Sequence, residues 1–177
     1  MRPSPTHADD EYRALRRTIA LRGTVRIALV PFTLAAWSLL AVALLLVSDI
    51  PTAIVFPLAV LVAGFEAVHA LHVGVERIGR YVQVYYETTP DGPKWETTAM
   101  AVGPALPGGG TDPLFAVVFG GAALANLVPL LALPPVPVEL AALVALHAGF
   151  LLRIVRARGA AARQRAVELE SYRAIKD

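Results

Sequence analysis

Residues 27–47 read IALVPFTLAAWSLLAVALLLV, an apolar run of 21 residues without a charged side chain. A helix rises about 1.5 Å per residue, so this run is long enough to cross the roughly 30 Å of hydrocarbon in a bilayer. Three further apolar stretches lie at 52–75, 113–133 and 136–155. The sequence therefore predicts an all-α integral membrane protein, a single domain over 1–177 with four transmembrane helices in an up-down bundle.

The composition agrees with a protein whose main solvent is the lipid bilayer. Hydrophobic residues make up 56% of the chain, charged residues 17%, and the mean hydropathy is +0.58. Soluble domains carry about 25% charged residues. The absence of cysteine excludes disulfides, thiolate-ligated zinc and iron–sulfur clusters. A formal net charge of only +2 gives no reason to expect nucleic acid as a partner.

The basic residues predict the orientation in the membrane. All 16 Lys and Arg lie in 1–26, 76–112 and 153–177, and none lies in the two short connections. Four spans would put these three segments on one side, and cytoplasmic segments hold the excess of Lys and Arg. We expect a multi-pass protein of the bacterial inner (plasma) membrane with cytoplasmic N- and C-termini.

Three polar segments are expected to have structure of their own. Residues 8–24 suggest an interfacial helix whose arginines meet anionic headgroups; a solvated helix leading into the membrane explains them equally well. Residues 156–177 suggest a helical C-terminal tail. Residues 81–100 contain YVQVYYE, TPDGP and KWETTAM, a pattern typical of two strands and a turn, and predict a cytoplasmic β-hairpin. The arginines placed at the membrane surface are Arg13, Arg16, Arg17, Arg22 and Arg26.

Polar residues inside the predicted second span form the candidate site. Residues 64–81 read GFEAVHALHVGVERIGRY, and helical spacing places Glu66, His69, His72 and Glu76 on about a third of the circumference. Ionisable residues are expensive in lipid and face protein or water. We expect Glu66 to face His147 of the fourth span.

The stripe predicts a site that handles protons or cations. Asn126 of the third span lies at a similar depth and would join the cluster. An oligomeric channel or transport module is the favoured function. The alternative is that these polar groups only form hydrogen bonds between helices, in a scaffold or accessory subunit that binds a membrane complex or its own copies.

Cofactor binding is a further alternative. Glu66, His69 and His147 could ligate a single metal ion, and His69 or His72 could pair with His147 on haem b. Neither cofactor is expected, because lone histidines are often packing residues. The sequence contains no G-x-S-x-G or H-E-x-x-H motif and no cysteine nucleophile, so no enzymatic activity is expected.

Overall fold

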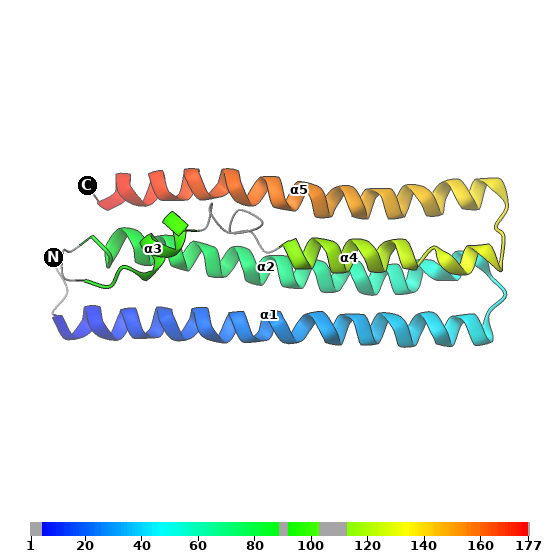
Figure 1. Ribbon diagram of the computed structural model, residues 1–177, viewed down its shortest axis with the longest axis horizontal. Helices are drawn as coiled ribbons and strands as arrows, with labels where there is room; N and C mark the ends of the chain where they lie inside the picture. The colour runs from blue at the N-terminus through cyan, green and yellow to red at the C-terminus, as the bar shows by residue number, and fades with distance from the viewer. Residues whose placement is uncertain (1–4, 89–91, 103–112, 177) are drawn as a thin grey trace. The chain divides into compact units, whose positions relative to one another are not determined.

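A computed structural model describes residues 5–88, 92–102 and 113–176, and every regular element in these ranges is helical (Figure 1). Two short 3-10 helices connect or follow the α-helices. The elements in chain order are α1 (Pro5–Val47), η1 (Pro51–Ile54), α2 (Val55–Tyr85), α3 (Trp95–Val102), α4 (Pro113–Ala125), η3 (Val128–Leu131) and α5 (Pro137–Lys176).

Three helical segments are long and apolar enough to cross a membrane. They are His7–Val47, Pro51–Tyr85 and Pro137–Ala157. The expected interfacial helix at 8–24 and the first span are one continuous helix, and the C-terminal tail continues α5. The predicted four-span bundle is wrong, because the stretch at 113–133 yields only a shorter apolar helix.

The predicted third span fails at Asn126. Helix α4 has 13 residues and ends at Ala125. The next backbone hydrogen bonds tighten to three-residue spacing, as from Leu127 N to Leu124 O at 3.1 Å. Pro129 then sits in η3, where its missing N–H would interrupt a continued α-helix. The apolar run is long enough to span a membrane, but the α-helix ends before the run does.

The predicted β-hairpin is also wrong. Residues 81–85 are the last turn of α2, and Trp95–Val102 form α3, with no strand among the described residues. Of the predicted turn TPDGP at 89–93, residues 89–91 lie outside the described residues. Val82 and Val84 point to different sides of a helix, yet they are 0% and 4% exposed. Alternating apolar residues therefore arise here from a helix covered on more than one side.

The chain divides into two compact units. The first, called the charged unit, comprises Met1–Arg26, Ala70–Thr111 and Gly159–Asp177. The second, called the apolar unit, comprises Ile27–His69 and Asp112–Arg158. Helices α1, α2 and α5 contribute residues to both. The charged unit contains 23 of the 30 charged residues, so the division follows the chemistry of the sequence.

The core of the apolar unit forms where α2, α4 and α5 pack together, with α1 beside them (Figure 1). Phe65 of α2 meets the rings of Phe119 and Phe150 edge to face, at centroid distances of 5.6 and 5.8 Å. Gly64 allows α1 to approach α2, because a Cβ at this position would overlap the Thr33 side chain. These contacts fix the helices that carry the polar side chains.

Candidate functional site

Asn126 is the centre of a buried hydrogen-bond network in the apolar unit. Its side chain is 2% exposed and lies where α4 ends. The amide nitrogen donates to the Ile54 carbonyl at 2.9 Å and faces His147 Nε2 at 3.1 Å. The amide oxygen accepts from Trp37 Nε1 at 3.0 Å. One side chain at the end of α4 therefore joins α1, η1 and α5.

The network determines the hydrogen position on His147. Its Nδ1 lies 2.7 Å from the Leu143 carbonyl, which can only accept, so Nδ1 carries the hydrogen. Nε2 is then an acceptor for the Asn126 amide. The opposite orientation of the amide would place its oxygen against the Ile54 carbonyl and its nitrogen against the Trp37 N–H. Two acceptors and two donors would then face each other, so this orientation is excluded. Every donor and acceptor named here thus has a hydrogen-bond partner, as a buried polar network requires.

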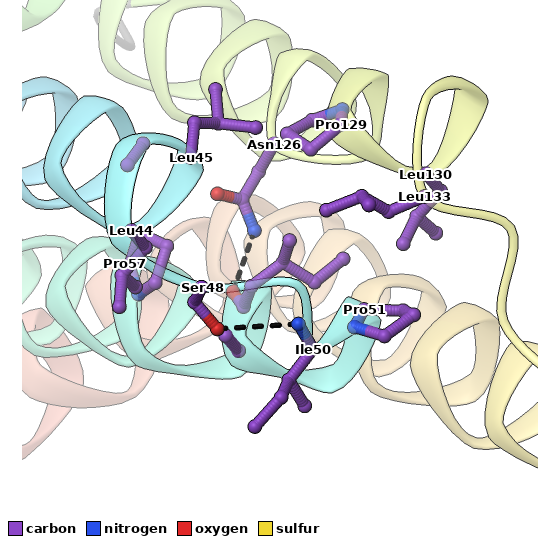
Figure 2. Close-up of a pocket in the computed structure, with 13 residues that line it drawn as sticks. Leu44, Leu45, Ser48, Ile50, Pro51, Pro57, Asn126, Pro129, Leu130 and Leu133 are labelled. Atoms are coloured by element: carbon purple, nitrogen blue, oxygen red, sulfur yellow. Dashed lines mark hydrogen bonds between the residues drawn. The ribbon is translucent and has the colours of Figure 1, made fainter.

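A small cavity lies beside Asn126. Its volume is about 20 Å³, enough for about one water molecule. Figure 2 shows the Asn126 amide directed at a backbone carbonyl and Ser48 accepting from the Ile50 N–H at 3.2 Å. Apart from Ser48 and Asn126, the side chains that line it are apolar. The cavity adjoins the network at the Asn126 side chain.

Glu66 pairs with Arg153 of α5. Arg153 Nη2 donates to Glu66 Oε2 at 2.8 Å, and the two side chains are 41% and 43% exposed. The guanidinium also lies over the Phe65 ring, at 5.8 Å from its centroid. His69 follows one turn later on α2 and stacks on the same ring at 5.9 Å. The half-exposed pair is the main charged feature of the apolar unit.

His72 and Glu76 lie in the charged unit, where arginines face them. Arg26 of α1 donates to His72 Nδ1 at 2.8 Å. Glu76 Oε2 accepts from Arg165 of α5 at 3.0 Å and from Arg80, one turn along α2, at 3.3 Å. The polar stripe of α2 thus meets cations from two other helices.

Arg80 connects this group to Glu168 of α5. Its side chain is 4% exposed, and its Nη1 donates to Glu168 Oε2 at 2.9 Å. Arg77 reaches the other oxygen of the same carboxylate at 3.0 Å, from a side chain that is 56% exposed. Because a buried arginine must keep its partners, Arg80 fixes how α2 and α5 pair.

Two glutamates position the short helix α3. The Glu87 carboxylate is buried and accepts from the backbone N–H groups of Glu96 and Thr97, at 2.7 and 2.6 Å. It therefore caps the positive N-terminal end of α3. Burial raises the pKa of the Glu96 carboxyl above its ordinary value, and the Arg16 guanidinium at 2.6 Å opposes that rise.

The structure separates the expected cluster into three places. Asn126 and His147 lie together; Glu66 pairs with Arg153 instead of His147; His72 and Glu76 belong to the charged unit. Among the described residues, no three His, Asp or Glu side chains gather as metal ligands. Both ring nitrogens of His147 already face partners.

The surface arginines also have specific places. Arg16 and Arg26 face Glu96 and His72, and Arg13 pairs with Asp10 at 3.2 Å on the exposed side of α1. Arg22 reaches the backbone of α2, because a Cβ on Gly74 would lie 2.6 Å from its Nη1. Arg17 is exposed. Several of these arginines thus form contacts within the protein.

Sequence reasoning missed the partners that complete these contacts. The missed residues are Arg153, Arg165 and Glu168 on α5 and Trp37 on α1, of which Arg153 and Trp37 lie within predicted apolar runs. A search for opposite charges at matching depths on the second and fourth predicted spans, which run in the same direction, would have suggested Arg153 for Glu66. The pairing itself depends on the rotation of each helix, which spacing alone does not determine.

Comparison with known proteins gave no match. No protein-family model matches the sequence, and no curated protein or solved structure shows significant similarity to it. The interpretation of the site therefore rests on its own chemistry.

Proposed function

We propose that the protein is a non-catalytic membrane scaffold or accessory subunit. The observation that carries the proposal is the pairing of the α2 stripe: Glu66, His72 and Glu76 each face an arginine on another helix. A guanidinium that holds a carboxylate competes with any cation that would bind there. Such pairs serve first to hold helices in one arrangement.

The proposed location follows from the distribution of charge between the units. The charged unit contains 13 of the 16 Lys and Arg and includes both ends of the chain. By the positive-inside rule, this unit is cytoplasmic, with the apolar helices in the bacterial inner (plasma) membrane. The partners would be the lipid bilayer, further copies of the chain or other subunits of a membrane complex.

Capture of partners in the native membrane tests the scaffold proposal. Membranes are cross-linked through the lysine and carboxylate side chains of the charged unit, and the products are identified by mass spectrometry. We expect one discrete complex to recur at several cross-linker lengths. Recovery of the uncross-linked monomer alone would contradict the proposal.

A second candidate, proton or cation handling, is favoured by one observation. The Glu66 carboxylate is 43% exposed, and His69 lies one turn away on α2, so both groups can be reached from outside the bundle. An exchangeable carboxylate beside an imidazole is the arrangement that proton relays use. Arg153 would then have to release Glu66 during each transfer.

Flux measurements decide between the two candidates. Purified protein in liposomes is compared with Glu66→Gln and with Glu139→Gln, a control that removes a carboxylate at the start of α5. Proton or cation handling requires a flux that only Glu66→Gln abolishes. The scaffold proposal requires equally low flux from all three proteins.

A further inference from the structure

The outward faces of the membrane helices differ in the size of their side chains. Helix α1 exposes large residues within the apolar unit, such as Phe32 at 75% and Leu46 at 80%, and α5 exposes Val138 at 75%. Between Val55 and His69, α2 exposes one large residue, Phe56. The other exposed positions on this part of α2 are alanines: Ala59, Ala63 and Ala67.

The alanine face has the spacing of a close helix contact. Ala59, Ala63 and Ala67 recur every four residues, so they lie on one side of α2. Small residues at this spacing let two membrane helices approach until their backbones touch. Exposed alanines also occur on α1 and α5, so this spacing indicates a contact face only together with the charged pair beside it.

The Glu66–Arg153 pair gives an independent reason to expect a partner at this face. Glu66 lies 60° round the helix from Ala63, and Arg153 reaches it from α5, where Gly149 is exposed one turn earlier. Both charged side chains remain more than two-fifths exposed. Charge exposed to lipid within an apolar span is costly, so protein or water must cover it.

We infer that the face formed by the three exposed alanines, Glu66 and Arg153, the alanine face, binds the same face of a second copy of this chain. The inference rests on the proposed scaffold function and names its partner. Two copies related by a two-fold axis would place each Glu66 near the other copy's Arg153, so the charges alternate around the axis. An unlike subunit would have to supply both charges in matching positions; a second copy supplies them by symmetry.

Arginine suits this role. Its planar fork has five N–H donors, and the contact within the chain uses one nitrogen at 2.8 Å. The remaining donors can reach a second carboxylate without breaking the first pair. The contact would thus cover the charges and keep Glu66 paired in both the free and the associated protein.

Cysteine cross-linking tests the contact directly. The natural chain has no cysteine, so a single-cysteine variant carries one thiol. Ala63→Cys is oxidised with copper–phenanthroline in native membranes, beside Leu39→Cys on α1, which is 72% exposed in the wild type. We expect a disulfide-linked species at twice the chain mass of 18.8 kDa for Ala63→Cys only. Equal yields from both variants would overturn the inference.

Two further sets of variants test size and charge. Ala67→Leu should weaken self-association about tenfold, which corresponds to about 1.4 kcal/mol, while Ala36→Leu on the exposed side of α1 should not. Glu66→Arg and Arg153→Glu should each abolish dimers, and the double exchange should restore them. Failure of the double exchange in a folded protein, or no effect of Ala67→Leu, counts against the contact.

The outcome also separates this inference from the proposed function. A cross-link from Ala63→Cys to a different subunit overturns the dimer and leaves the scaffold proposal standing. If Ala63→Cys forms no cross-link and the charged unit captures no partner, both the dimer and the scaffold proposal are contradicted. A dimer that carries Glu66-dependent flux supports the contact and contradicts the scaffold proposal.

Discussion

The two units hold the same three long helices by different chemistry. In the charged unit, ion pairs around the buried Arg80 join α2 to α5, and the Arg26–His72 hydrogen bond joins α1 to α2. In the apolar unit, packed rings, a neutral network around Asn126 and the half-exposed Glu66–Arg153 pair join them. Where water is available, charges can be compensated by solvent; where it is not, each donor needs a fixed acceptor. The comparison predicts different responses to substitution and salt.

Removing the centre of the neutral network should have the largest effect. Asn126→Ala leaves the Trp37 N–H, the Ile54 carbonyl and His147 Nε2 without this partner. We expect a loss of about 2–4 kcal/mol in the free energy of unfolding, from several buried polar groups left unsatisfied. Ser38→Ala, which removes an exposed local bond, should change it by less than about 0.5 kcal/mol. Denaturation in detergent measures both, and the loss should not depend on salt.

Two arginines on the same carboxylate offer a matched comparison in the charged unit. Arg80 and Arg77 both bind Glu168, but their side chains are 4% and 56% exposed. Arg80→Met should cost about 2–3 kcal/mol of unfolding free energy, since it unpairs buried charge. Arg77→Met should cost less than about 1 kcal/mol and lose its effect at high salt. Equal losses would show that burial does not distinguish these pairs.

A smaller, local effect is expected at α3. Glu87→Gln removes the charge that caps the helix at the Glu96 and Thr97 N–H groups. Loss of a cap costs about 0.5–2 kcal/mol. Hydrogen exchange at these two amides should accelerate while the apolar unit keeps its protection. Glu170→Gln, at an exposed position of α5, is the control and should leave both rates unchanged.

The smallest effect concerns pH. Because burial raises the pKa of Glu96 in the folded protein above its ordinary value of 4.5, its protonated form favours folding. The contribution of Glu96 to stability is present below pH 4.5 and is lost as the pH rises through the folded pKa. Glu96→Gln should flatten the stability curve in that window. An unchanged slope would mean that the ion pair with Arg16 fully offsets burial.

The sequence predicted the apolar helices better than their ends. The runs at 27–47, 52–75 and 136–155 lie almost wholly in helices, in which a single segment satisfies its own backbone hydrogen bonds, as lipid requires. The run at 113–133 shares their composition, but the Asn126 side chain and Pro129 favour a turn there. A hydropathy average over the whole run does not register the effect of single residues such as these.

Residues 81–85 were misjudged for a related reason. Tyr81 and Tyr85 stack at 4.5 Å across one helical turn, and Tyr81 also meets Tyr172 of α5 at 5.8 Å. Aromatic and β-branched residues favour strands when tertiary contacts do not decide the conformation. Here the contacts with α5 stabilise a helix instead. The composition of residues 81–85 is indeed typical of a strand, but the sequence pattern does not show that α5 packs against them.

The candidate site was predictable as a set of residues and not as a set of pairs. Spacing placed Glu66, His69 and Glu76 on one side of α2. Helix rotation and the position of Arg153 decide that Glu66 pairs with a cation and not with His147. The Asn126–His147 contact was expected only as proximity.

The network around Asn126 also limits how the apolar unit can move. Sliding one helix past its neighbours by a turn displaces it about 5.4 Å, the step used in some conformational switches. Such a step would separate Asn126 from the Ile54 carbonyl, His147 and the Trp37 N–H together. The four helical segments are therefore locked in one axial register. Any signal through this part of the protein must travel as a tilt or a rigid-body rotation, not as a piston stroke.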